Sequence, residues 1–435
     1  MLHYYNEREE GIPVPEKKNL VPFPRSAKKR KQVLRQAESL KLRRLTRLRS
    51  LVGWLLLISI VLFSAVNFTL FAPSSLRQTF QIIASALGPN AERDGVIDYP
   101  TQSATVVHPA GSSLAVVDDE ALHILQLGDV SQQKTALSYA SPVIDTNNNY
   151  VLVYDRGAYD FSFCSTLTQL FSLKLTSPIR TASIGSGDNF VVVTDETGYK
   201  SAVTVYSASS REEDHHIWRW RTPDYYVQDA ALSPSGTHLC ALVFQQNGAQ
   251  LESSLQFFDM DAGEVRASVN LGAVVGYTVQ WLDDSNVVAI SDKAAFTAHR
   301  RGEQTSHTTY TASDLLGFAF DTDSYILAQR SWSGDARATI TRYDKSGEAK
   351  ASLDLPSAPE SLSYAGGQLG VLTTSGLYVY NNSLRPDWKC TSAGAAQRVM
   401  LTEDGGAWLF YSKYAQRVTK SSALSEDFTD DSTLV

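Results

Sequence analysis

The chain has 435 residues, of which 43% are hydrophobic and 10% aromatic, enough for a sizeable packed core. Its net charge of -7 is unevenly divided, because residues 1–50 hold 14 Lys and Arg against 5 Asp and Glu, whereas the remainder holds 25 against 41. The acidic remainder argues against a nucleic-acid partner, and three isolated cysteines (Cys164, Cys240 and Cys390) exclude a disulfide framework and a zinc site.

Residues 1–50 form a basic arm with two parts. Residues 1–24 contain four prolines and have the composition of a disordered segment. The apolar residues between Leu34 and Leu48 are spaced loosely along one helical face, as in a basic amphipathic helix on anionic headgroups. We favour this interpretation over a docking segment for a cytoplasmic partner.

The segment Leu51–Phe71 predicts a transmembrane helix. Its 21 residues carry no charge, and at helical rise they span about 31 Å, the thickness of a hydrocarbon core. Residues 25–50 are strongly basic, whereas Ala72–Ala91 contains only Arg77. The positive-inside rule therefore predicts a cytoplasmic N-terminus and an extracytoplasmic C-terminal domain.

A cleaved signal peptide is the alternative interpretation of Leu51–Phe71. Signal peptides have shorter apolar regions behind a short basic start. Here the apolar run is longer and follows a 50-residue arm, so we expect the anchor to be retained in the cell membrane. Residues 72–91 follow with a serine cap, an apolar stripe and Gly88-Pro89, which predicts a short amphipathic spacer helix and a linker.

From residue 92 to residue 420 the pattern changes to short strands separated by Gly, Asn, Asp and Ser. One apolar strand recurs at intervals of 36 to 49 residues, which is close to the length of one β-propeller blade. Its eight occurrences are LAVVDD (114–119), YVLVYD (150–155), FVVVTD (190–195), LCALVF (239–244), NVVAIS (286–291), YILAQR (325–330), LGVLTT (369–374) and AWLFYS (407–412).

A shorter strand precedes each of these strands, and most are followed by two more, which predicts four antiparallel strands per repeat. We therefore predict an all-β, extracytoplasmic β-propeller of eight blades, with seven blades or a pair of sandwiches as alternatives. The last repeat lacks an outer strand after Gln416–Thr419, and Gly95–Tyr99 is placed to supply it. The acidic tail, residues 421–435, is predicted to be disordered.

Several stretches of the predicted propeller carry a family resemblance. They are YDRG (154–157), IRTASIG (179–185), IWRW (217–220), VQDAALSPSG (227–236) and QNGAQLESSLQFF (246–258). In this order they resemble an uncharacterised family, catalogued as a domain of unknown function, of membrane-anchored propeller-like proteins from clostridial Gram-positive bacteria. The resemblance implies a location at the bacterial cell membrane and supplies no functional residues.

The repeats are also similar in general pattern to quinoprotein-type and Trp-Asp-type propellers. The tryptophans do not recur in register, however, so the docking motifs of quinoprotein blades are missing. We therefore expect no quinone cofactor, and no other cofactor signature is present.

The run IWRWRTPDYY (217–226) contains the best candidates for ligand binding. It combines residue types that are enriched in binding hot spots. Strand alternation predicts Trp218 and Trp220 packed between blades, with Arg219 and Arg221 exposed. Tyr225 and Tyr226 are candidates for a ligand face at one end of the propeller.

Three other motifs are interpreted as structural. REEDHH (211–216) resembles a metal-binding cluster, but adjacent side chains point in different directions, so we predict a solvated turn. DMDAGE (259–264) lacks the full acidic pattern of a calcium loop and predicts a hairpin turn. YDRGAYDF (154–161) predicts a tight turn at Gly157 with a surface Asp–Arg pair. We predict no metal site and no catalytic residues.

A repeat architecture without a catalytic constellation predicts a non-enzymatic binding or scaffold module. The expected partners are the lipid bilayer and a protein or cell-envelope polymer. One alternative is an envelope glycan hydrolase or lyase, whose carboxylates would meet in the central funnel only after folding. The other is a signal-relaying membrane protein that works through the basic arm.

Overall fold

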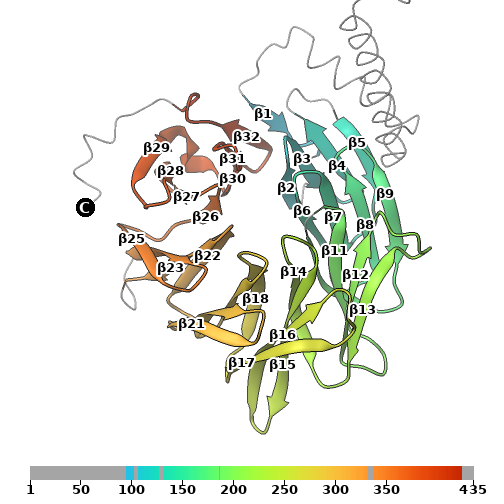
Figure 1. Ribbon diagram of the computed structural model, residues 1–435. Coiled ribbons are helices and arrows are strands. Elements are labelled where there is room, and N and C mark those ends of the chain that lie inside the picture. The colour runs from blue at the N-terminus through green and yellow to red at the C-terminus, as the bar shows by residue number, and fades with distance from the viewer. Residues whose placement is uncertain (1–94, 102–105, 127–130, 186, 332–336, 424–435) are drawn as a thin grey trace, which may run out of the picture. The chain divides into compact units, whose positions relative to one another are not determined.

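The computed structural model describes residues 95–101, 106–126, 131–185, 187–331 and 337–423. Its strands form eight sheets, each of four antiparallel strands. Seven sheets use four strands that are consecutive in the chain, and the eighth takes one strand from the opposite end of the described residues. The sheets follow one another around a common centre (Figure 1), so this part of the chain is an eight-bladed β-propeller, as predicted.

We number the blades in chain order and give each from its innermost to its outermost strand. Blades 1 to 4 consist of β2 (Val106–Ala110), β3 (Ser113–Val117), β4 (Ala121–Gln126) and β5 (Ser131–Ala136); β6 (Pro142–Thr146), β7 (Tyr150–Asp155), β8 (Asp160–Ser165) and β9 (Gln169–Lys174); β10 (Ile179–Ile184), β11 (Asn189–Thr194), β12 (Ser201–Ser207) and β13 (His216–Thr222); and β14 (Tyr226–Leu232), β15 (His238–Asn247), β16 (Gln250–Asp259) and β17 (Val265–Gly272).

Blades 5 to 8 follow the same order. They consist of β18 (Gly276–Trp281), β19 (Asn286–Ser291), β20 (Ala294–His299) and β21 (Glu303–Thr309); β22 (Leu315–Asp321), β23 (Ser324–Arg330), β24 (Ala338–Asp344) and β25 (Ala349–Leu355); β26 (Ser361–Ala365), β27 (Gln368–Thr373), β28 (Gly376–Tyr380) and β29 (Pro386–Cys390); and β30 (Arg398–Leu401), β31 (Ala407–Phe410), β32 (Tyr414–Val418) and β1 (Val96–Asp98). A short 3-10 helix, η2 (Thr391–Ala395), joins blades 7 and 8.

The apolar strand that recurs in the sequence is the second strand of every blade. All five residues of β3 and all four of β31 are buried. A strand covered on both faces needs apolar side chains on both, which is why these segments read as continuous apolar runs. Side chains from adjacent blades share one core, as where Trp218 of blade 3 packs with Phe258 of blade 4. The three cysteines are buried and free.

The ring closes through β1, which pairs antiparallel with β32 and completes blade 8. Val96 pairs with Gln416 and Asp98 with Tyr414. Ile97 is fully buried together with Trp408 of blade 8 and Leu114 of blade 1, so one core joins the first and last blades. The predicted contribution of Gly95–Tyr99 to the last blade is confirmed.

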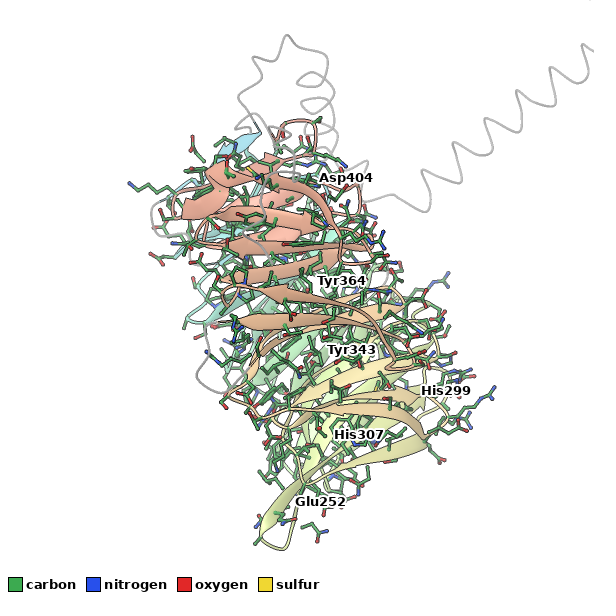
Figure 2. The ribbon with its side chains drawn as sticks, turned by 90° about the vertical axis from the view of Figure 1, so that its left-hand side faces the viewer. Glu252, His299, His307, Tyr343, Tyr364 and Asp404 are labelled. Carbon is green, nitrogen blue, oxygen red and sulfur yellow. The ribbon has the colours of Figure 1, made fainter. Side chains whose placement is uncertain are left out.

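Antiparallel order places the connections of every blade on two opposite faces. We call the end that carries the turns between second and third strands, together with the links between blades, the linker face. The other end carries the remaining turns, and we call it the hairpin face. In Figure 2, His299 and Asp404 lie along the edge that corresponds to the hairpin face, and Glu252 lies at the far end of the β15–β16 hairpin.

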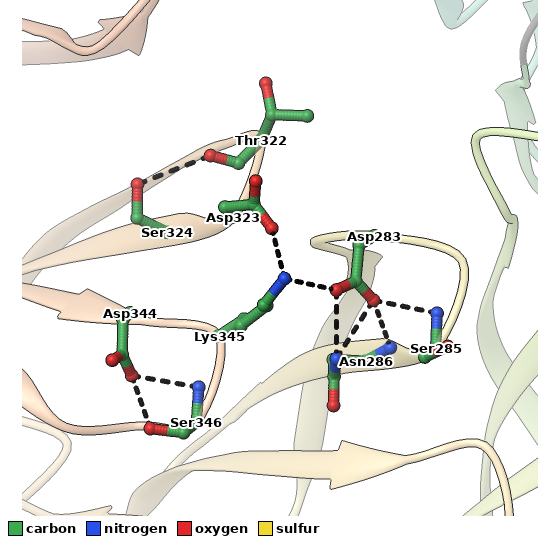
Figure 3. A network of polar contacts seen from close by, with 9 residues as sticks. All are labelled: Asp283, Ser285, Asn286, Thr322, Asp323, Ser324, Asp344, Lys345 and Ser346. Carbon is green, nitrogen blue, oxygen red and sulfur yellow. Dashed lines mark hydrogen bonds and ion pairs between the residues drawn. The ribbon is translucent and has the colours of Figure 1, made fainter.

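Aspartates near the ends of first strands fasten neighbouring blades to each other. Asp145 of β6 accepts a hydrogen bond from the Ile184 amide of blade 3 at 2.8 Å, and Asp321 of β22 accepts one from the Gly367 amide of blade 7 at 2.7 Å. On the hairpin face, Lys345 bridges Asp283 of blade 5 at 3.0 Å and Asp323 of blade 6 at 2.8 Å (Figure 3).

Several predicted segments lie outside the described residues. They are the basic arm 1–50, the transmembrane segment 51–71, the spacer 72–91 and residues 424–435 of the tail. Within the residues that the structure describes, no helix has the length and apolarity needed to cross a membrane.

Candidate functional site

A cavity of about 520 Å³ lies along the innermost strands of blades 3, 4 and 5. Side chains and backbone of three first strands, β10, β14 and β18, form its walls, and Arg156 from the β7–β8 turn adds to them. The cavity is lined by Arg156, Arg180, Thr181, Ala182, Ser183, Gln228, Asp229, Ala230, Ala231, Tyr277, Thr278, Val279 and Gln280. Because these are the innermost strands of their blades, the cavity lies on the side of blades 3 to 5 that faces the centre of the ring.

A β-bulge at the start of each of these first strands shapes the cavity. Ile179 and Thr181 pair with adjacent residues of β11, so Arg180 is an extra residue without a partner. Gln228 is the extra residue of β14 and Tyr277 that of β18. A bulge turns its extra residue away from the regular alternation. All three extra residues line the cavity, so the bulges direct an arginine, an amide and a phenol toward one space.

The mouth of the cavity on the linker face is cationic and aromatic. Arg156 is exposed, and within the described residues its side chain has no hydrogen bond or ion pair. Arg180 is held by Asp195, with its Nε donating to Oδ1 at 3.1 Å. Tyr277 is 43% exposed, which is unusual for a large ring.

Asp229 is the acidic residue of the cavity wall. Its carboxylate accepts hydrogen bonds from the Thr278 hydroxyl at 2.7 Å, from the Val279 amide at 3.0 Å and from the Ala230 amide at 2.9 Å. Burial raises the pKa of Asp229 to about 6, and these hydrogen bonds act in the opposite direction. The carboxylate thus links blades 4 and 5.

Asp145 of blade 2 is the other first-strand acid that influences Asp229, since its charge adds to the raised pKa of Asp229. Burial also raises the pKa of Asp145, against the hydrogen bonds of the Ile184 and Thr146 amides. Both carboxylates therefore bind backbone amides of the next blade. Of the two, only Asp229 lines the cavity.

Exposed aromatic side chains gather around this mouth. Nine large hydrophobic side chains of the described residues are exposed, and six of them lie at linker-face ends of blades 2 to 5: Tyr159, Tyr199, Tyr226, Leu251, Val275 and Tyr277. Large exposed apolar side chains that cluster on one face are typical of an interaction surface. We call these six residues the tyrosine patch.

The β15–β16 hairpin extends the tyrosine patch. Each strand has ten residues, and Gln245–Glu252 lies beyond the pairing of β14 and β17 with this hairpin. Its base is fixed by Phe244, which stacks on Tyr226 with ring centroids 5.4 Å apart. Figure 2 shows Glu252 on the projecting end. The hairpin thus forms a two-stranded ribbon beside the exposed tyrosines.

The structure places the predicted site residues in three different settings. Trp218 is buried between blades 3 and 4, where its Nε1 donates to the Ala262 carbonyl at 3.0 Å. Trp220 packs beside Phe258 with ring centroids 4.8 Å apart. Arg219 is exposed on the outer strand and donates from Nε to the Thr204 hydroxyl at 3.0 Å. The predicted alternation is thus observed, and it assigns Trp218 to the core.

The other three predicted residues lie at the linker face. Arg221 pairs with Glu196 at 2.7 Å, and its guanidinium lies over the ring of Tyr199. Tyr225 is half-buried against the core shared by blades 3 and 4. Tyr226 is exposed and belongs to the tyrosine patch, with Lys200 Nζ 5.2 Å from its ring centroid. None of the predicted residues lines the cavity.

The cavity residues Arg156, Arg180, Asp229 and Tyr277 were missed by sequence reasoning. The sequence of YDRG predicts a turn, and the segments that form β10, β14 and β18 predict only short strands before the apolar ones. One extra residue shifts the alternation of polar and apolar side chains within each of these first strands. This shift is the feature of the sequence that could have located the cavity.

The motifs predicted to be turns are turns. REEDHH joins β12 to β13, and Asp214 pairs there with His216 at 2.5 Å. DMDAGE joins β16 to β17 as a hairpin, and Gly157 has a positive φ of 82° in the β7–β8 turn. The predicted surface Asp–Arg pair is wrong, because Asp155 is buried and accepts hydrogen bonds from the Ala140 and Ser141 amides. Within the described ranges, no group of three His, Cys, Asp or Glu side chains is arranged to hold a metal ion.

Comparisons with known proteins give a family and a general likeness. The model of a "Family of unknown function (DUF5711)" matches residues 101–415. No curated protein matches the chain. A chain of a mitotic checkpoint complex is 13% identical, with a TM-score of 0.45 and coverage of 77% of this chain and 96% of that one.

Two further solved structures are similar at the same level. The Cps50 (Swd1) β-propeller domain of Myceliophteria thermophila is 9% identical, with a TM-score of 0.45 and coverage of 75% and 99% of the two chains. Hydrazine synthase of Kuenenia stuttgartiensis is 10% identical, with a TM-score of 0.43 and coverage of 77% and 100%.

Proposed function

Because the chain belongs to a family of unknown function, DUF5711, we propose its function from its own geometry: it is a membrane-anchored, extracytoplasmic binding module. Its N-terminus is cytoplasmic and Leu51–Phe71 is the anchor. Its linker face captures a protein partner from the cell envelope and does not chemically alter it. The uncharged run of Leu51–Phe71 and its basic flank support the anchor.

The tyrosine patch is the observation that carries this proposal. Tyr199, Tyr226 and Tyr277 are each at least 40% exposed, although the fold offers ample core for aromatic rings. Tyrosine and arginine are enriched among residues that dominate protein interfaces. Tyr277 of the patch lines the cavity together with Arg156, whose side chain has no hydrogen bond or ion pair within the described residues. A partner can therefore insert a side chain there while its backbone crosses the patch.

The carboxylates of the first strands favour binding over hydrolysis. Asp229 and Asp145 are held by backbone amides of adjacent blades. A glycosidase or lyase needs carboxylates that are free to meet the substrate on both sides of the reacting bond. The wall of the cavity supplies hydrogen-bond donors and aromatic surface, which are the groups that bind a ligand specifically.

The proposal is tested by cross-linking in intact membranes. The double variant Tyr226→Ala/Tyr277→Ala removes two exposed rings at the starts of β14 and β18, and we expect the yield of a cross-linked protein partner to fall at least about tenfold. Ile217→Ala/Val265→Ala is the matched control, because both side chains are exposed on outer strands away from the patch. The control should retain the cross-link.

Three results would contradict the proposal. Equal loss in both double variants would show that exposed apolar area, and not the patch, holds the partner. Cross-links to a polysaccharide alone would replace the protein partner with an envelope polymer. Turnover of a glycan or peptide by the purified chain, abolished by Asp229→Asn, would make the propeller an enzyme.

The orientation has a separate test. Protease added to intact cells should cleave in the exposed β12–β13 turn around Arg211–Asp214 if the propeller lies outside the membrane. The same turn should be cleaved in solubilised protein, which controls for accessibility of the site itself. Protection in intact cells with cleavage after solubilisation would contradict the extracytoplasmic location.

A further inference from the structure

A second cavity lies on the opposite, hairpin face, between blades 4 and 5, and has a volume of about 230 Å³. Its polar lining comes from turns and strand ends of both blades. Arg300 and Arg301 follow directly after His299, which Figure 2 shows at the hairpin-face edge. The lining side chains that matter for its chemistry are His238, Asp259, Arg266, Trp281, Arg300 and Arg301.

The charges in this cavity are unbalanced. Asp259 is its one acid, and Arg266 Nε lies 3.0 Å from Oδ2 while Arg300 Nη1 lies 3.9 Å from Oδ1. Arg301 adds a third guanidinium, so the three arginines and Asp259 sum to a charge of +2, and His238 Nδ1 lies 3.1 Å from Asp259 Oδ1. The nearby Asp284 binds the Ser235 amide at 2.8 Å and does not line the cavity.

Donors in this cavity are left without acceptors. The Nε of Arg300 is shielded from solvent and has no hydrogen-bond partner, and no interaction of the Arg301 side chain occurs within the described part of the chain. Arg301 is exposed, whereas a shielded and unpaired N–H such as that of Arg300 is costly, and an oxyanion in the cavity would satisfy it.

We infer that this cavity binds the phosphate group of a phosphomonoester. Guanidinium groups match phosphate oxygens in pairs, and the net charge of +2 matches a phosphomonoester dianion better than a singly charged carboxylate. The floor consists of Trp281, with the His238 ring stacked 6.3 Å from it. This apolar floor suits the carbon skeleton of a small polyol or sugar phosphate. The site is independent of the tyrosine patch, which lies on the other face.

The test uses the full chain in detergent, titrated with glycerol phosphate and followed by calorimetry. We expect saturable binding of one equivalent, with no binding of glycerol or acetate. Arg301→Gln should weaken the affinity at least about tenfold, because it removes a charged hydrogen-bond donor. Arg385→Gln is the matched control, since Arg385 is an exposed and unpaired arginine on the hairpin face of blade 7. We expect less than about a twofold change from it.

Two outcomes would overturn the inference. One is the absence of saturable binding at millimolar glycerol phosphate in protein whose thermal unfolding is normal. The other is equal weakening by Arg301→Gln and Arg385→Gln, which would mean that phosphate responds to overall charge and not to this cavity. Arg300→Gln, measured in parallel, should weaken binding as Arg301→Gln does.

Discussion

Blades 3 to 6 differ from the other four blades in a single feature of their innermost strands. Each of β10, β14, β18 and β22 contains a bulge with one extra residue, whereas β2, β6, β26 and β30 pair in unbroken register. The cavity of about 520 Å³ lies along three of the bulged strands, β10, β14 and β18. Blade 8, in which β1 pairs with β32 and closes the ring, is one of the blades with a regular first strand.

The difference shows how one repeat serves two purposes. In a regular first strand, successive side chains point to opposite faces of the blade, toward its two neighbours. A bulge adds a residue without changing the pairs on either side, so a side chain is freed from packing and becomes available to a ligand. Arg180, Gln228 and Tyr277 are such residues, and they are the functional candidates of this half of the ring.

Single-residue deletions should separate the two halves most strongly. Deleting Leu362 from the regular strand β26 shifts the pairing of its neighbours and disturbs the packing of Tyr364, the buried residue of that strand, so we expect a loss of more than about 4 kcal/mol in unfolding free energy. Deleting Gln228 removes only the extra residue of β14 and leaves Val227 and Asp229 opposite their present partners. We expect a loss below about 2 kcal/mol.

Denaturant unfolding of the two deletion variants measures this contrast. Equal destabilisation would show that the bulge at Gln228 is as necessary for the fold as regular pairing is in β26. The cross-linking yield of the Gln228 deletion should fall, because the wall of the cavity is altered while the fold remains.

Replacement of Asp229 by Asn should have an intermediate effect that depends on pH. The amide can accept some of the three hydrogen bonds but presents its NH2 group to the other donors, so we expect a loss of about 1 to 3 kcal/mol. The pKa of Asp229 in the folded protein is about 6, above its value of about 3.9 in the unfolded chain. The stability contributed by its protonation is therefore present at low pH and is lost as pH rises through about 6.

Since the Asn variant lacks this titration, the cost of Asp229→Asn should be larger at about pH 5 than at about pH 7. Urea unfolding of both proteins at the two pH values provides the measurement. A cost that grows with rising pH would instead mean that the hydrogen bonds from Thr278, Val279 and Ala230 outweigh burial and keep Asp229 ionised.

Lys345→Met should have the smallest effect. The ammonium group bridges Asp283 and Asp323 between blades 5 and 6, but the Lys345 side chain is 47% exposed. Exposed ion pairs contribute less than about 1 kcal/mol. Thermal unfolding at low and high salt should differ less for the variant than for the wild type. A loss comparable to that of Asp229→Asn would show that hairpin-face bridges hold the blades as firmly as first-strand aspartates do.

The sequence predicted the repeat well because the repeat depends on burial. All eight second strands contain apolar runs. These runs can be recognised in the sequence even though the turns between strands differ in length and sequence. Gly95–Tyr99 was recognised as the missing strand by counting strands. The positions of Trp218 and Arg219 followed from alternation alone.

The cavity could not be predicted by the same reasoning. Arg156 lies on blade 2, Arg180 on blade 3 and Tyr277 on blade 5, and only the closure of the ring brings them together. Likewise, Arg266 lies in β17 of blade 4, whereas Arg300 and Arg301 lie in the β20–β21 turn of blade 5. Sequence spacing describes one blade at a time, whereas both cavities are formed between blades.

The pairing of β1 with β32 has a consequence for biosynthesis. Val96 emerges from the ribosome 320 residues before its partner Gln416. Seven sheets can therefore assemble in order, but the eighth stays incomplete until β32 has been synthesised. A nascent chain that stops before Tyr414 leaves the earliest strand without a place to pair. Closure of the ring therefore requires that synthesis has passed Val418, the last residue of β32.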